Sequence, residues 1–202
     1  MTLKQKIIEE SLRLFSVKGY MNTSLTDIIQ AAGTSKGGFY NHFKSKEQLF
    51  HETLSAARKI WRDRNLHGLD GVESPLMKIQ KLLENYRDRY LADSHNLPGG
   101  CIFVNLAIEL SDQSPGLAAE VNEGFERLKG MIRRLLDREK AGGAMPQSAD
   151  TARITGMIVS GLLGACVMYT SDKSLENLDA TIRSLISYLH ESAGAQGRIS
   201  GP

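Results

Sequence analysis

Two adjacent glycines, Gly37 and Gly38, lie in a stretch that is otherwise suited to a short helix, TSKGGFYNHF from Thr34 to Phe43. Each glycine costs about 1 kcal/mol relative to alanine in a helix interior. A helix of one or two turns tolerates such a pair only where something outside the segment needs bare backbone. This constraint limits what the stretch can be.

The segment before it has the length and punctuation of another short helix. Ser24 and Asp27 form a capping-box pattern that opens SLTDIIQAA, and Gly33 ends it. Two short helices separated by a glycine stop predict a helix-turn-helix. Its shared core is expected to consist of Ile28, Ile29, Ala32, Phe39 and Phe43.

The other positions of the second helix are small, polar or cationic: Ser35, Lys36, Gly37, Gly38, Tyr40, Asn41 and His42. Such a surface suits a helix laid in the major groove of DNA, where glycines let backbone amides approach closely. Lys46 supports this hypothesis, because a cation in the first turn of the next helix opposes the macrodipole unless an anion docks there. The alternative for Lys46 alone is an exposed lysine tolerated at small cost.

Charge is unevenly distributed along the 202 residues. Residues 1–64 hold 11 Lys+Arg and 6 Asp+Glu, a net of +5, and the rest hold 14 and 17, a net of −3, which together give +2. A basic N-terminal segment favours a polyanionic partner. Chance unevenness remains the alternative for charge taken alone.

Helical spacing of apolar residues recurs along the chain, and no stretch alternates as a strand would. We therefore predict an all-α fold of about nine helices, in which three or four short helices precede longer ones. The Gly- and Asp-rich break HGLDGVES, residues 67–74, predicts a boundary between a domain at 1–64 and a larger one at 65–192. We expect residues 193–202 to form a disordered tail.

Several classes of protein and site are disfavoured. The N-terminal sequence lacks the apolar run of a signal peptide, and the distant Cys101 and Cys166 make no disulfide framework, so a cytoplasmic location is expected. No phosphate-binding glycine loop, metal-ligand cluster or nucleophile motif is present. His42 has no second ligand at metal spacing. We therefore expect no enzyme activity, no metal and no cofactor.

The run TDIIQAAGTSKGGFYNHFKSKEQLF, Thr26 to Phe50, closely resembles the DNA-binding domain of TetR-family transcriptional repressors. The resemblance implies a homodimer with an N-terminal three-helix helix-turn-helix domain. It also implies a larger helical domain that binds a small-molecule inducer and thereby releases a palindromic operator in double-stranded DNA. Matched by position, the implied contacts are phosphate for Ser24 and Thr26, the groove for Lys36, Gly37, Gly38 and Asn41, and the DNA backbone for Tyr40, His42 and Lys46.

A third class is a relative of this family that has lost DNA binding. The intact cationic and glycine positions at residues 36–46 argue against it.

The uncharged segment ITGMIVSGLLGACVMY, Ile154 to Tyr169, is shorter than the ~20 residues that span a bilayer, so we expect no membrane segment. Small residues recur in it every four positions, which favours close helix packing. The family places its dimer interface on the last two long helices. We therefore expect both a core helix and a dimer interface, formed by Gly156, Ser160, Gly164, Leu178, Ile182 and Leu185.

The pocket that the family implies has these candidate residues, each of which also suits an ordinary core: Tyr86, Tyr90, Cys101, Phe103, Phe125 and Met168. An apolar or aromatic inducer is expected.

Cys101 follows Pro98, Gly99 and Gly100, which places it near the first turn of a helix. Free amides there lower the pKa of a thiol and make it more reactive. The segment also resembles the G-C-x-x-x-N-x-A-x-E stretch of a TetR subgroup that includes the electrophile- and oxidant-sensing repressor NemR, which implies a sensing cysteine at Cys101. A buried, inert thiol is the alternative.

Overall fold

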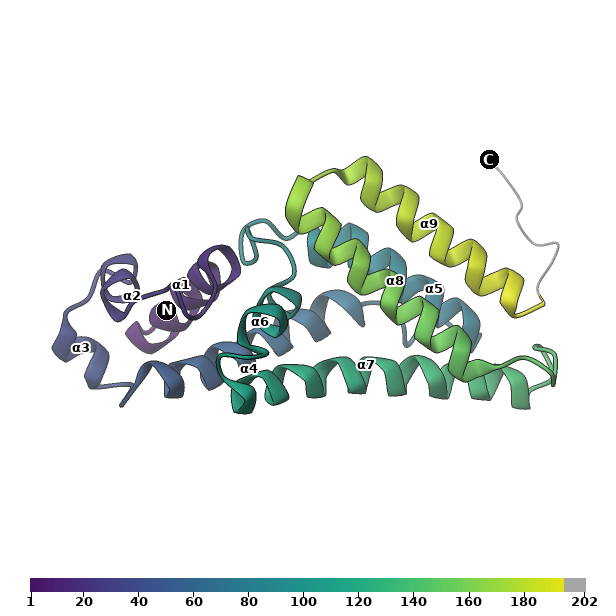
Figure 1. Ribbon diagram of the computed structural model, residues 1–202, viewed down its shortest axis with the longest axis horizontal. Helices are drawn as coiled ribbons and strands as arrows, with labels where there is room; N and C mark the ends of the chain where they lie inside the picture. Colours follow the sequence, from purple (N-terminus) through teal and green to yellow (C-terminus); the bar gives the residue numbers. More distant parts are fainter. Residues whose placement is uncertain (195–202) are drawn as a thin grey trace. The chain divides into compact units, whose positions relative to one another are not determined.

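The structure, a computed structural model, describes residues 1–194 (Figure 1). These residues form nine α-helices and one short π-helix, and the same range contains no strand. The predicted all-α class is confirmed. Of the tail expected at 193–202, all but the first two residues lie outside the described range.

The described chain divides into two compact units, and each is described by itself. The first comprises residues 1–63 and 90–122, and the second begins at residue 64, runs to 89 and resumes at 123. Contacts therefore group a segment from the middle of the chain with the N-terminal helices.

The first unit contains α1 (Leu3–Lys18), α2 (Leu25–Ala31), α3 (Lys36–Tyr40), nearly all of α4 (Lys46–Asn65), α6 (Ile102–Leu110) and the start of α7 (Pro115–Ala141). Local sequence signals set the early boundaries. A capping box at Ser24 opens α2, as predicted, and another at Thr2 opens α1. Gly19, with φ +80°, ends α1, and Gly33, with φ +60°, follows α2, in a region of backbone space that favours glycine.

Aromatic side chains form the centre of the first unit. The Tyr20 ring lies edge-on to Phe15 and Phe50, with ring centroids 5.4 and 4.9 Å apart. Ile28, Ala32, Phe39 and Phe43 are buried as predicted, and Ile29 is half-buried. This core holds α2 and α3 against α1 and α4.

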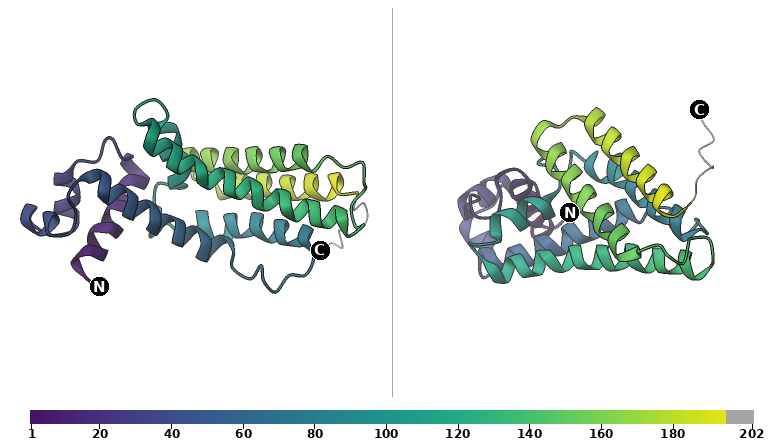
Figure 2. Two further views of the ribbon diagram at one scale, coloured as in Figure 1. Left: turned by 90° about the horizontal axis from the view of Figure 1, so that it is seen from below. Right: turned by 45° about the vertical axis from the view of Figure 1, so that its right-hand side comes forward.

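The second unit contains α5 (Pro75–Asn85), most of η1 (Tyr86–Leu91, π-helical), the remainder of α7, α8 (Thr151–Asp172) and α9 (Leu175–Ser192). Ser74 caps α5 and Pro75 occupies its first position, as the sequence indicates. Helix α9 lies beside α8 and α5 (Figures 1 and 2). The unit is thus a helical bundle.

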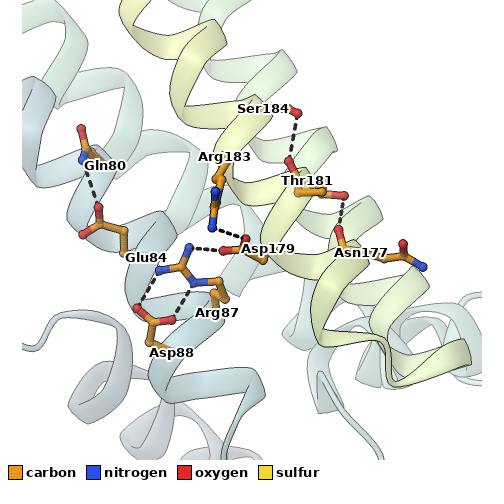
Figure 3. Close-up of polar contacts among 10 residues, drawn as sticks. Gln80, Glu84, Arg87, Asp88, Asn177, Asp179, Thr181, Arg183 and Ser184 are labelled. Carbon is orange, nitrogen blue, oxygen red and sulfur yellow. Dashed lines mark hydrogen bonds and ion pairs between the residues drawn. The ribbon is translucent and has the colours of Figure 1, made fainter. Parts of the chain in front are cut away.

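An ion-pair cluster joins η1 to α9 within this bundle (Figure 3). Arg87 contacts Asp88 and Asp179 through N···O distances of 2.6 Å, and Arg183 contacts Asp179 at 2.7 Å. The hydrogen bond to Asp88 is the largest cause of a raised pKa of the Arg87 guanidinium, and the two carboxylates add to it. Because the cluster is partly exposed, we expect each pair to contribute at most about 1 kcal/mol.

Helix α8 is the one described helix that is long and apolar enough to cross a membrane by length and composition. Part of it packs inside the bundle, with 39% of the apolar window buried. Ile154, Ile158 and Leu162 are buried, and Gly161 leaves room for Leu185 of α9. A core helix meets the same length and composition criteria, which agrees with the core role expected for this segment.

Leu178 and Ile182 are buried within the protomer, at 2% and 0% exposure. They belong to the bundle's own core, so they offer no surface to a second subunit. Periodicity identified their apolar stripe correctly, but the chain's own helices cover it. This corrects their assignment to the dimer interface.

Candidate nucleic-acid interface

Helix α3 is a short, well-anchored element. The Ser35 hydroxyl accepts a hydrogen bond from the Gly38 amide at 3.1 Å, which caps the helix. The helix ends at Tyr40, earlier than the sequence predicts, and residues 41–42 form a turn. Buried Phe39 and Phe43 fix the helix and turn to the core. The remaining side chains are therefore presented outward.

The outward surface carries most of the predicted DNA contacts. The exposed members are Ser24, Thr26, Ser35, Lys36, Gly37, Tyr40, Asn41 and His42, whereas Gly38 and Lys46 are half-buried. The Ser24 hydroxyl also accepts the Asp27 amide as a helix cap at 3.0 Å. The Ser24 hydrogen bonds are the largest cause of a lowered pKa of the Asp27 carboxyl.

The two adjacent glycines serve different purposes. A Cβ at Gly37 would meet nothing closer than the Ser35 Oγ, at 3.8 Å. A Cβ at Gly38 would overlap the Thr34 hydroxyl and lie 3.6 Å from Leu3 Cδ2. Packing inside the unit therefore explains Gly38, whereas nothing inside the unit explains Gly37.

Lys46 is the first residue of α4, as predicted. Its Nζ lies 4.2 Å from the centroid of the Tyr20 ring, a cation–π contact. Burial lowers the pKa of the Lys46 ammonium, and Glu109 and Asp27 act in the opposite direction. The aromatic ring thus supplies a local reason for a cation at this helix terminus, in addition to any docked anion.

Glu109 of α6 is a half-buried carboxylate. In the structure it accepts hydrogen bonds from the backbone amides of Tyr20 and Met21, in the turn between α1 and α2. The signal in the sequence is the G-C-x-x-x-N-x-A-x-E stretch, which ends on Glu109, but it does not identify the amides that the carboxylate binds.

The pocket candidates are divided between the units. Tyr86, Phe125 and Met168 belong to the second unit, and Tyr90, Cys101 and Phe103 to the first. Within the first unit, the Tyr90 hydroxyl lies 3.7 Å from the Cys101 Sγ. Cys101 is buried and occupies the N-cap of α6, which confirms its predicted place next to a first helical turn. Met168 is 59% exposed in the protomer.

The strip Gly156, Ser160 and Gly164 follows an open face of α8. A Cβ at Gly156 or Gly164 would meet no atom within 4 Å. Met157 and Met168 flank the strip and are 55% and 59% exposed. Leu185, by contrast, is half-buried and contacts Gly161 within the bundle.

We predict that Gly37→Ala raises the stability of the DNA-free protein by about 0.5–1 kcal/mol, because alanine favours the helix and meets open space. Gly38→Ala is the matched control and should be the less stable variant, since its methyl group displaces the Thr34 hydroxyl. Urea unfolding of both variants measures the difference. Equal stabilities would contradict the distinction between the two glycines.

Two family models match the chain. One, bacterial regulatory proteins of the tetR family, matches residues 7–53, and the other, a tetracyclin repressor-like C-terminal domain, matches residues 75–185. The first includes α2 and α3, and the second spans from α5 into α9.

Curated relatives and solved structures agree with the family models. The HTH-type transcriptional repressor DhaR of Mycobacterium sp. is 25% identical, over 88% of this chain and 87% of its own. The repressor NemR of Escherichia coli is 21% identical, over 91% and 94%. A TetR transcriptional regulator from Chloroflexus aurantiacus superposes with a TM-score of 0.86 at 29% identity, over 94% of each chain.

A structure of the TetR-family regulator CifR, a cysteine mutant in complex with 26 bp of double-strand operator DNA, shares the fold. Its TM-score is 0.76 at 22% identity, over 91% of this chain and 94% of that one. The models, the repressor relatives and the shared architecture agree. The chain belongs to the TetR family of bacterial regulatory proteins, and it is a DNA-binding transcriptional regulator, not an enzyme.

Proposed function

We propose that the protein is a cytoplasmic, homodimeric repressor that places α3 in the major groove of a palindromic operator and is released by a small-molecule inducer. The observation that carries the proposal is the outward face of α3. It presents Lys36 and the open backbone of Gly37, and the turn that follows adds the side chain of Asn41; all three residues are exposed. Bare backbone at Gly37 is useful only to a partner that approaches closely.

The proposed contacts follow from this face. Lys36, Gly37 and Asn41 enter the groove with Ser35 and Gly38 beside them, and Tyr40 and His42 contact the DNA backbone. Thr26, exposed at the start of α2, is proposed to donate a hydroxyl hydrogen bond to phosphate. The Ser24 hydroxyl donates to the Asp27 carboxylate at 2.7 Å, so its proposed phosphate contact requires exchange of that hydrogen bond. Lys46 is proposed to bind phosphate from its position over the Tyr20 ring, where the aromatic contact restricts the motion of the ammonium group.

The open strip of α8 supports the dimer. Gly156 and Gly164 present bare backbone, and Ser160 a small side chain, near exposed methionines, so a second copy of the helix is able to approach closely. A two-fold dimer presents two copies of α3 to two half-sites. Palindromic operators follow from that symmetry.

We expect Gly164→Trp to dissociate the dimer while the protomer stays helical, because the new ring projects into space that the protomer leaves open. Light scattering at micromolar concentration measures the change in mass. Gly124→Trp, at a position on α7 that is also open, is the matched control and should remain dimeric. A monomeric parent protein would contradict the proposed assembly.

For the inducer, the resemblance of the segment around Cys101 to the subgroup that includes NemR makes an electrophile the first class to test. The thiol lies at the N-cap of α6, close to the Tyr90 hydroxyl. Addition of its thiolate to a quinone forms one carbon–sulfur bond at the start of a helix that contacts α1. The thiol is buried, so the reagent must enter through local opening. A non-covalent apolar or aromatic inducer is the alternative.

We predict that benzoquinone or hypochlorite releases the parent protein from its DNA but not Cys101→Ser. The other cysteine provides the control, since Cys166→Ser should respond like the parent. Fluorescence anisotropy of a labelled duplex, selected from genomic fragments by the parent, follows the release. Equal release of the parent and Cys101→Ser would leave Cys101 as a packing residue, and no release from either would indicate the non-covalent alternative.

A further inference from the structure

Glu109 holds the turn that connects α1 to α2. One carboxylate oxygen accepts the Tyr20 amide at 2.7 Å, and the other accepts the Met21 amide at 2.9 Å. Hydrogen bonds from amides to a carboxylate are stronger than those between neutral groups. A single side chain of α6 therefore binds two successive amides of a segment 88 and 89 residues away in sequence.

The contact between Glu109 and the turn requires glycine at position 19. Gly19 has φ +80°, and a Cβ there would overlap the Glu109 carboxylate. The glycine thus satisfies two requirements, the left-handed backbone that follows α1 and the space that the carboxylate occupies. A substitution at Gly19 would displace Glu109 while leaving its chemistry intact.

Asn105, one helical turn before Glu109, makes a parallel contact. Its Nδ2 donates to the Ser16 carbonyl at 3.1 Å, and the Gly99 amide donates to the Ser16 hydroxyl at 3.3 Å. A Cβ at Gly99 would overlap the Ser16 carbonyl, so the two backbones are in close contact. Helix α6 is therefore held in register with the last turn of α1.

The held turn leads directly to the DNA-binding surface. Tyr20, whose amide Glu109 binds, packs its ring on Phe15 and Phe50 and carries the Lys46 ammonium on its face. Four residues later Ser24 begins α2. The location of the turn thus determines the position of the Lys46 ammonium group and the position at which α2 begins.

We propose that Glu109 is a positioning residue for DNA binding, whose carboxylate fixes the α1–α2 turn and, through it, Lys46 and the start of α2. The proposal rests on the DNA contacts proposed above and is independent of any inducer. For a variant that lacks the Glu109 carboxylate, positioning and charge alone predict opposite changes in DNA affinity. Removing a carboxylate from a DNA-binding unit should strengthen DNA binding by simple electrostatics, whereas loss of positioning should weaken it.

The decisive variant is Glu109→Gln, which keeps the size of the side chain but cannot accept both amides. Its matched control is Asp112→Asn, which removes the same charge at an exposed site three residues further on. The probe is a duplex selected from genomic fragments by the parent protein, with anisotropy measured at fixed salt. We expect Glu109→Gln to bind on the order of tenfold more weakly than the parent, as for the loss of one charge-assisted hydrogen bond. Asp112→Asn should bind equally or slightly more tightly.

Hydrogen exchange in the DNA-free protein separates positioning from general loss of stability. In Glu109→Gln, the Tyr20 and Met21 amides should exchange faster, while the amides of buried Phe39 in α3 and Leu54 in α4 keep parent rates. This measurement needs no DNA. If the parent does not bind an operator, the proposed function fails, but the exchange rates of Tyr20 and Met21 still show whether Glu109 holds the turn.

A second variant guards against a Glu109→Gln protein that does not fold. Gly19→Ala keeps the carboxylate but crowds it and strains the backbone of the same turn at φ +80°, so it should also weaken binding. If both changes act through one contact, the double variant should lose less affinity than the product of the two single effects. The proposal is overturned if Glu109→Gln binds as tightly as Asp112→Asn, if Gly19→Ala keeps parent affinity, or if the two effects multiply.

Discussion

The contact between α6 and the end of α1 is the interaction on which the first unit depends. Residues 1–63 are only part of this unit, and domains of about 60 residues bury too little surface to be more than marginally stable. Helix α6 adds buried Ile102, Leu106 and Leu110 to the same compact unit, and Glu109 supplies partners for two amides of the α1–α2 turn. The DNA-binding helices are therefore completed by a segment that the sequence pattern places in the other domain. A displacement of α6 would therefore be transmitted to the α1–α2 turn through the hydrogen bonds of Glu109.

Features determined by neighbouring residues could be predicted from the sequence. The capping boxes at Thr2 and Ser24, the glycine after α1 and the Ser74–Pro75 start of α5 all depend on residues within one turn of the boundary. The all-α class and the helix-turn-helix core follow from periodicity for the same reason. Resemblance to the TetR family then supplied the function, because the motif from Thr26 to Phe50 lies within this locally determined region.

Features that depend on distant partners could not be predicted in this way. The sequence marks Lys46 as an unfavourable cation, but only the fold brings the Tyr20 ring beneath it. It marks Leu178 and Ile182 as an apolar stripe, but it does not reveal whether the same chain or a second copy covers them. The change to a π-helix at residues 86–91, beside the Arg87 ion pairs, has no local signal either.

The central claim is that the exposed face of α3 contacts DNA. It is tested most directly by the salt dependence of DNA affinity for Lys36→Ala and for Lys59→Ala, an equal loss of charge at an exposed site on α4. A cation in the groove also neutralises charge on the flanking phosphates, so its loss flattens the slope of log affinity against log salt by up to about 0.9 per subunit, or about two for two subunits. The account predicts weaker binding and this flattening for Lys36→Ala, with parent behaviour for Lys59→Ala. The same affinity and slope in both variants would contradict it.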